Sequence, residues 1–187
     1  MIVRVHNPMS TADFRNMPKR KRLNPNGART KPYTLVPALV PKPLWGRSAQ
    51  RLLGRGMWKR IRQNVVEAAR HACQLCADAP SPLYGDPLTC HEVWRYDDKR
   101  RVATLEGFRA QCPKCDSAVH LGLAMTCGAG NKAIAQLRKV NGIGLGEAER
   151  LCDDAFAEWK SRSKKKWRIR VAKLLLEKYP ALARLTE

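Results

Sequence analysis

The sequence predicts an α+β fold that is mostly helical, with a small two-stranded hairpin near the middle of the chain. Three observations support it. Apolar residues recur at helical spacing in several segments, residues 88–108 alternate in part between apolar and polar, and a Cys-x-x-Cys pair stands on each side of that stretch. We therefore expect one folded unit over residues 47–126, followed by a helical basic region over residues 127–187.

Residues 1–46 are expected to form an extended basic arm. Prolines in this stretch include those at positions 18, 25, 32, 37, 41 and 43. Proline disfavours both helix and central strand, so the segment reads as extended chain. It is either a tail that follows phosphates and becomes ordered on binding, or a solvated linker, and the sequence leaves both open.

A helix is predicted over residues 56–72, where Trp58, Ile61 and Val65 recur at helical spacing. The apolar stripe is expected to face the core. Basic side chains occupy other positions of the same helix, where they either contact phosphates or are solvated.

The hairpin is predicted from "LTCHEVWRY" and "RRVATLEGF", joined by a polar turn at residues 97–100. Pro113 then stands where a helix can begin, and "KCDSAVHLGLAM" continues it. Three more helices are predicted, over residues 131–140, over residues 146–163, and as a basic helix within residues 164–187 that ends at Pro180.

The chain of 187 residues has a formal net charge of +20, and this charge is unevenly spread. Residues 1–72 and 161–187 are strongly basic, whereas the stretch between them is nearly neutral. A positive charge of this size favours binding to a polyanionic partner, most often nucleic acid. The alternative is that the chain is a charged subunit of a larger assembly. The side chains expected to contact nucleic acid are Arg60, Arg62, Lys164, Lys165, Lys166, Arg168 and Arg170.

No apolar run approaches the length that crosses a membrane, and the N-terminus has no secretory pattern. We therefore expect no membrane partner and a cytoplasmic, reducing setting, in a bacterium or a phage. Seven cysteines in that setting favour metal binding or chemistry over disulfides.

Four of the cysteines have the spacing of a metal site. Cys73 and Cys76 form one Cys-x-x-Cys pair, and Cys112 and Cys115 form the other. The two-residue spacer lets both thiolates of a pair face one ion, and two pairs complete the closed tetrahedral shell of a structural zinc site. The alternatives are a redox dithiol and chance packing.

His91 lies on the first predicted strand, in "TCHEVW". A lone histidine on a β-strand is most often packed in the core or hydrogen-bonded. Here two cysteine pairs surround it, and Asp116 and His120 are within plausible reach, one helical turn apart on a shared face. A functional role as a base or a metal ligand is therefore favoured.

These residues resemble the HNH endonuclease family. The resemblance runs over about residues 44–126 and is carried by the motifs "CQLC", "CHEVWRYDD", "LEGF" and "CPKC", with His120 and Gly122 after them. It implies a ββα-metal core in which a four-cysteine zinc site joins the hairpin to its flanking helices.

The resemblance also implies a reaction. His91 matches the general base that activates water for attack on a phosphodiester bond, with DNA favoured over RNA as substrate. A catalytic Mg²⁺ or Mn²⁺ is expected near Asp116 and His120.

The sequence departs from the family pattern at three positions. Asp116 stands where the family usually has histidine, Cys90 stands where many members have Asp or His, and no Asn occurs near Gly107. A carboxylate at position 116 changes the preferred ion without abolishing binding. The alternative function is thus a catalytically degenerate, zinc-containing DNA- or RNA-binding protein that acts within a nucleoprotein assembly.

Overall fold

The computed structural model describes residues 22–23, 29–30, 33–77 and 88–186. Its main sheet has three strands in the order β3-β4-β5, and β1 and β2 form a separate short pair. The strands are β1 Arg22–Leu23, β2 Arg29–Thr30, β3 Thr89–Asp97, β4 Val102–Gln111 and β5 Arg168–Val171. The helices are η1 Lys42–Leu44, α2 Ala49–Ala68, α3 Pro113–Val119, α4 Leu121–Thr126, α5 Gly130–Asn141, α6 Leu145–Arg162, α7 Lys173–Lys178 and η2 Pro180–Thr186. The mixed, mostly helical composition agrees with the sequence prediction.

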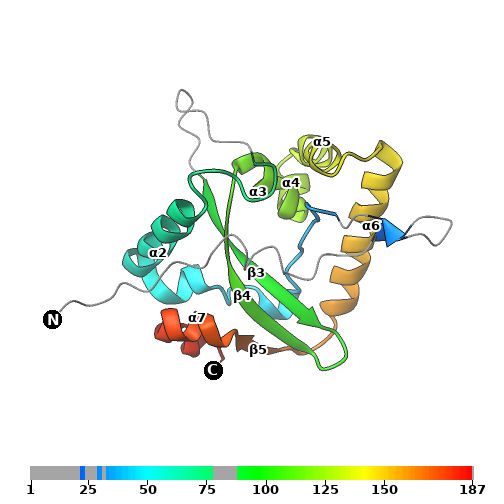
Figure 1. The fold of residues 1–187 in the computed structure, drawn as a ribbon. Helices are drawn as coiled ribbons and strands as arrows, with labels where there is room; N and C mark the ends of the chain where they lie inside the picture. The colour runs from blue at the N-terminus through cyan, green and yellow to red at the C-terminus, as the bar shows by residue number, and fades with distance from the viewer. Residues whose placement is uncertain (1–21, 24–28, 31–32, 78–87, 187) are drawn as a thin grey trace.

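The β3–β4 hairpin lies at the centre of the molecule and confirms the predicted strand pair (Figure 1). Its turn is closed by Asp97, whose side chain accepts a hydrogen bond from the backbone N–H of Arg100 at 2.8 Å. The register of the pairing shifts between Val93 and Trp94. This irregularity is a β-bulge, which changes the direction in which the following side chains point. β3 is an edge strand, so one side of its backbone faces away from the sheet.

Helix α2 is longer than predicted at its start. It begins after Ser48, whose side chain accepts from the N–H of Arg51 and so caps the helix. Gly54 adopts a positive φ of 70° inside it and kinks the helix, a conformation that glycine accommodates. Ile61 is fully buried, as the apolar stripe predicts.

The described residues bury two large apolar clusters. One cluster gathers residues from α2, the sheet and the C-terminal segment: Ile61, Leu105, Phe108, Ile169, Leu182 and Leu185 are among its members. The other holds α3, α4 and α5 together with both Cys-x-x-Cys pairs, through Leu35, Val119, Leu121 and Leu137. Helices α3 to α5 thus form a group at the end of the hairpin away from its turn, and α6 runs from that group toward the turn, as Figure 1 shows. Within the described residues, no helix has both the length and the apolar character needed to span a bilayer.

The predicted basic helix at the C-terminal end is wrong in its first half. Residues Arg168–Val171 form strand β5, which pairs parallel with β4. Ile169 and Val171 are buried while Arg168 and Arg170 are exposed, which is the period-two pattern of a strand. The helix predicted there appears only from Lys173 onward, as the short α7.

The expectation of an extended arm is wrong for residues 33–46, which belong to the folded unit. We call residues 33–41 the strap. Leu35 in the strap is 0% exposed, and its N–H and C=O are both hydrogen-bonded by the Asn141 side chain at the end of α5. Further along, the carbonyl of Val40 accepts from Trp159 of α6 at 3.1 Å. Most of the remaining arm lies outside the described residues.

Candidate metal centres and the groove beside them

The four predicted metal-binding cysteines come together in space. Cys73 and Cys76 follow α2, and Cys112 and Cys115 stand at the start of α3. Their sulfur atoms all lie within 4.8 Å of one another, so the four can hold a metal ion such as zinc. The first pair is fixed to the hairpin by Gln74, which exchanges two hydrogen bonds with Ala110 of β4, one through its backbone N–H and one through its side-chain oxygen.

The surroundings of this cluster suit thiolate ligands. Cys73 and Cys115 are buried, and a hydrogen bond from the Cys115 thiol lowers the pKa of Cys73 to about 4. The same shared proton, with burial, raises the pKa of Cys115. The amide of Gln136 donates to the Cys115 sulfur at 3.2 Å, as a partner of a ligating thiolate does. A donor set of four sulfurs fits a soft or borderline ion and leaves no ligand position for a substrate.

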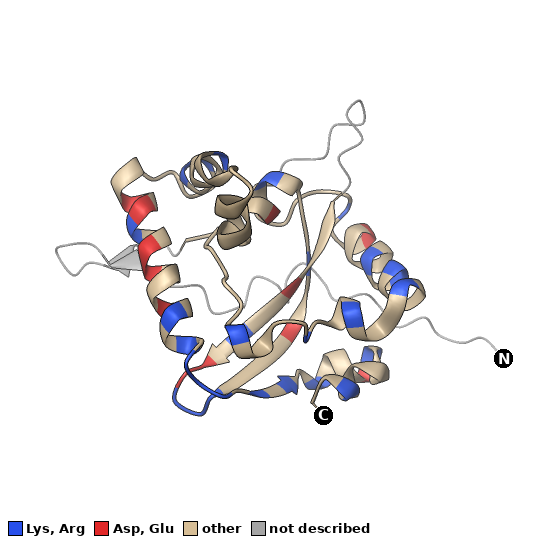
Figure 2. Ribbon diagram, turned by 180° about the vertical axis from the view of Figure 1, so that it is seen from behind, with Lys and Arg blue, Asp and Glu red and all other residues tan. Residues whose placement is uncertain are grey.

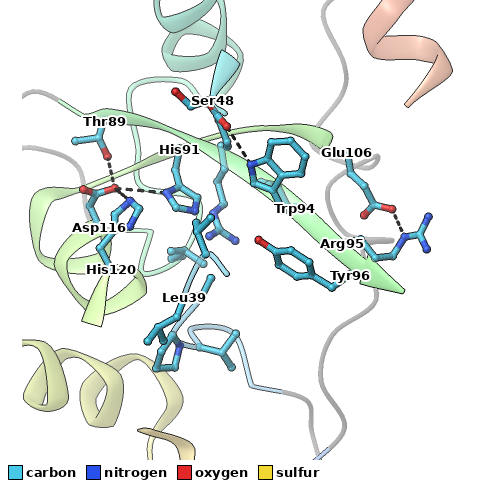
Figure 3. Close-up of a pocket in the computed structure, with 18 of the residues that line it drawn as sticks. Leu39, Ser48, Thr89, His91, Trp94, Arg95, Tyr96, Glu106, Asp116 and His120 are labelled. Carbon is cyan, nitrogen blue, oxygen red and sulfur yellow. Dashed lines mark hydrogen bonds and ion pairs between the residues drawn. The ribbon is translucent and has the colours of Figure 1, made fainter. Parts of the chain in front are cut away.

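His91, Asp116 and His120 form a second cluster that offers one ligand atom each within 4.8 Å (Figure 3). His91 comes from β3, Asp116 from α3, and His120 from the junction between α3 and α4. The Asp116 carboxylate lies 3.8 Å from Nδ1 of His91 and 3.9 Å from Nε2 of His120. Two imidazoles and a carboxylate can bind a divalent ion, and the predicted site residues therefore converge.

Asp116 is oriented by two residues that the sequence analysis did not identify. Thr89 Oγ1 donates to Oδ1 of Asp116 at 3.1 Å, and Gln111 Nε2 donates to the same oxygen at 2.6 Å. Thr89 and Gln111 are register partners in the hairpin, so the pairing of the strands places both side chains beside Asp116. Among the described residues, Gln111 and Gln136 are the two buried polar side chains, and each donates to one of the two clusters. A lone glutamine in a strand gives no signal for such a role in the sequence.

The His91 side chain is only 10% exposed. Burial, followed by the nearby charges of His120 and Arg109, lowers the pKa of His91 to about 3. The imidazole is therefore neutral at neutral pH, and its unprotonated nitrogen can accept a hydrogen bond or coordinate an ion.

Two neighbours of His91 on β3 have structural roles. The Glu92 carboxylate sits at the start of α2, where it accepts from the N–H of Gln50, and it also accepts from the Trp94 indole. Burial raises the pKa of the Cys90 thiol to about 12, which keeps it protonated and unsuited to binding a hard ion. Neither residue belongs to the His91 cluster.

A groove of about 1130 Å³ runs along β3 and contains the His91 cluster. The strap and α6 supply the facing wall, so segments far apart in the sequence enclose the site. Figure 3 shows Leu39 of the strap across from His91, with Trp94 and Tyr96 further along β3. Trp159 and Arg162 of α6 also line the groove, and the Arg162 guanidinium lies over the Tyr96 ring, 4.9 Å from its centroid.

The basic residues expected to bind nucleic acid fall in different places. Arg60 is exposed on α2. Arg62 instead uses Nε and Nη2 to donate to the carbonyl of Leu88 at 3.2 and 3.1 Å, so this side chain holds the start of β3. Arg170 is exposed on β5.

The other predicted basic residues join the hairpin turn. Lys164–Lys166 lie in the loop after α6, and the backbone N–H of Arg168 donates to the carbonyl of Arg101 at 2.9 Å. Figure 2 shows the Lys and Arg positions of this loop, blue on the ribbon, beside those of the turn. We define the basic tip as these residues together: Lys99, Arg100, Arg101, Lys164, Lys165, Lys166 and Arg168. The part from residues 99–101 was not anticipated from the sequence.

Comparison of the chain with family models, with curated proteins and with solved structures found no match.

Proposed function

We propose that this protein is a metal-dependent endonuclease of the HNH type that hydrolyses phosphodiester bonds, with DNA as its expected substrate. The observation that carries the proposal is the convergence of His91, Asp116 and His120 inside a groove of a chain whose net charge is +20. A strand histidine beside a carboxylate and a second imidazole, next to a four-cysteine cluster, agrees with the roles that the sequence resemblance implies.

Each residue of the cluster has a distinct part in this proposal. His91 is neutral and largely buried, with a ring nitrogen that is unprotonated at neutral pH, and in this proposal it takes the proton of a water molecule that attacks phosphorus. Asp116 and His120 would hold a divalent ion, which when bound polarises the phosphate and stabilises the leaving oxygen. Thr89 and Gln111 fix the Asp116 carboxylate, which keeps the ligand set in one geometry.

The donor set bears on which ion is used. One imidazole with one carboxylate is less suited to Mg²⁺, which prefers oxygen ligands, than to Mn²⁺. We therefore expect activity with Mn²⁺ to exceed activity with Mg²⁺. The four-cysteine cluster is assigned to zinc in a structural role, because it is closed and joins α2 to α3 on either side of the hairpin.

The test is cleavage of supercoiled plasmid and of a labelled single-stranded DNA by the purified full chain with Mg²⁺ or Mn²⁺. Wild-type protein should nick, and His91→Ala should lower the rate by at least about 100-fold, the scale of general-base catalysis. His71→Asn is the matched control, because His71 is exposed and has a positive φ of 54° that asparagine tolerates. Equal nicking by wild type and His91→Ala would refute the role of His91.

The second candidate function is a nucleic-acid-binding protein without nuclease activity. The departures at Asp116 and Cys90 favour it, since Cys90 is a half-buried thiol that stays protonated where the resemblance places a ligand. In this case the wild-type chain would bind DNA or RNA and leave it intact under every divalent ion.

A further inference from the structure

We propose that the groove along β3 takes a single, unpaired nucleic acid strand, running from the His91 cluster toward the basic tip. This inference rests on the proposed nuclease function and specifies its substrate as unpaired rather than duplex nucleic acid.

The dimensions of the groove exclude a duplex. Its lining on β3 extends from Thr89 to Tyr96, which at the rise of a strand is about 23 Å. A volume of about 1130 Å³ spread over that length gives a channel roughly 8 Å across. The major groove of B-form DNA is by itself about 12 Å wide, so a complete duplex is far wider than this channel.

The depth of the site requires the substrate to enter the channel. His91 is 10% exposed and lies between β3 and the strap, with Leu39 opposite. A duplex that rests on the outside of the protein would hold its phosphates away from this imidazole. An unpaired strand can enter, because its backbone is narrow and its bases can turn aside.

The walls of the channel offer aromatic surface for bases, and their acidic side chains already have partners. Trp94, Tyr96 and Trp159 line the channel and are partly exposed, so bases can contact aromatic surface. The acidic side chains that line it are already engaged. Glu106 pairs with Arg95, and the Glu92 carboxylate accepts hydrogen bonds at the start of α2.

The channel leads toward the basic tip. Arg162 lines the channel and also binds Asp98 in the hairpin turn at 2.6 Å, so the end of the channel and the tip adjoin. Lys99, Lys164 and Lys166 are exposed there, and among the described residues no ion pair is found for these three. They can attract the phosphates of a strand that leaves the channel.

The first test compares binding rather than cleavage, using full-length His91→Ala with its zinc retained and no added divalent ion. Three labelled DNAs share one sequence: a single strand, a blunt duplex, and a duplex with an unpaired flap. Fluorescence anisotropy should give a Kd for the single strand and the flap at least about 10-fold below that for the duplex. A duplex Kd equal to or below the single-strand Kd would overturn the proposal.

The second test locates the exit of the strand. Lys164→Gln/Lys166→Gln should raise the single-strand Kd and reduce the slope of log K against log salt by about 1.4, because each lost phosphate contact on a single strand contributes about 0.7. The matched control is Lys132→Gln/Arg138→Gln, two exposed basic residues on α5, which should leave the slope unchanged. Equal slopes for the two variants would overturn the assignment of the tip.

A polyglutamate of equal charge serves as competitor, and should displace the single strand poorly. Equal competition would mean a general polyanion surface and would overturn the proposal. Failure of the proposed function shows itself separately, as the absence of cleavage of both the plasmid and the labelled single strand by wild-type protein with any divalent ion. The ratio of the duplex Kd to the single-strand Kd tests the proposal of an unpaired strand in the groove, whether or not cleavage occurs.

Discussion

Asn141→Ala should destabilise the protein, because this side chain fastens the strap to the rest of the fold. Its Oδ1 accepts from the backbone N–H groups of Thr34 and Leu35 at 2.9 and 3.0 Å, and its Nδ2 donates to the carbonyl of Leu35 at 2.6 Å. Alanine would leave two polar groups of a fully buried residue without a partner.

The magnitude follows from which of these groups water can reach. The N–H of Thr34 is exposed, so water replaces its lost partner and little is lost there. The N–H and C=O of Leu35 would be left unsatisfied, at about 1–1.5 kcal/mol each, so the free energy of unfolding should fall by about 2–3 kcal/mol. With a urea m-value of about 2 kcal/mol/M, the midpoint should fall by roughly 1–1.5 M.

The assay is urea unfolding of the full chain at a fixed zinc concentration, followed by circular dichroism. Asn131→Ala is the matched control, since it removes an exposed asparagine from the same helix and gains the same helix propensity. A loss for Asn141→Ala of under about 0.5 kcal/mol relative to this control would show that the strap is not held by these bonds.

Three further predictions concern the two clusters. Cys115→Ser should abolish the cooperative unfolding transition seen by circular dichroism. The free energy of zinc binding to such a site, about 10–16 kcal/mol, is as large as the whole free energy of unfolding of a typical domain, about 5–15 kcal/mol. An unchanged transition would argue against a structural ion. Gln111→Leu should weaken Mn²⁺ binding about 10–100-fold in calorimetry, since Asp116 loses the donor at 2.6 Å, and unaltered affinity would contradict its orienting role. For His91, whose pKa is lowered to about 3, the folded state binds fewer protons than the unfolded state, so stability is full above about pH 6.5 and declines as the pH falls toward 3. Between pH 7.5 and 5.5 it should fall by about 1.4 kcal/mol more in wild type than in His91→Asn, and parallel curves would contradict this assignment.

Much of the hairpin and both clusters could be predicted from local sequence. Two residues between cysteines set the distance between their sulfurs, and alternation along a strand sets which side chains share a face. For the same reason Asp116 and His120, four residues apart, fall on one side of a helical turn. These are short-range geometric consequences of the backbone, so they hold before any tertiary contact forms.

The errors lie where a distant partner decides the conformation. Residues 168–171 carry a weak pattern, and they become a strand because β4 offers an edge with which they can pair. The backbone of Leu35 is hydrogen-bonded by an asparagine that lies 106 residues away, which a proline-rich stretch cannot reveal. Gln111 likewise acts only through its contact with Asp116.

The sequence by itself determined the basic character of the chain, the central hairpin and the residues of both clusters, because composition and spacing are local properties. Tertiary structure alone decided that the strap closes one side of the groove and that Gln111 and Gln136 each donate a hydrogen bond to a residue of one cluster. It also decided that the hairpin turn lies against the loop after α6. The physical reason is that burial and hydrogen bonding between distant segments depend on how the whole chain packs, and no window of neighbouring residues contains that information.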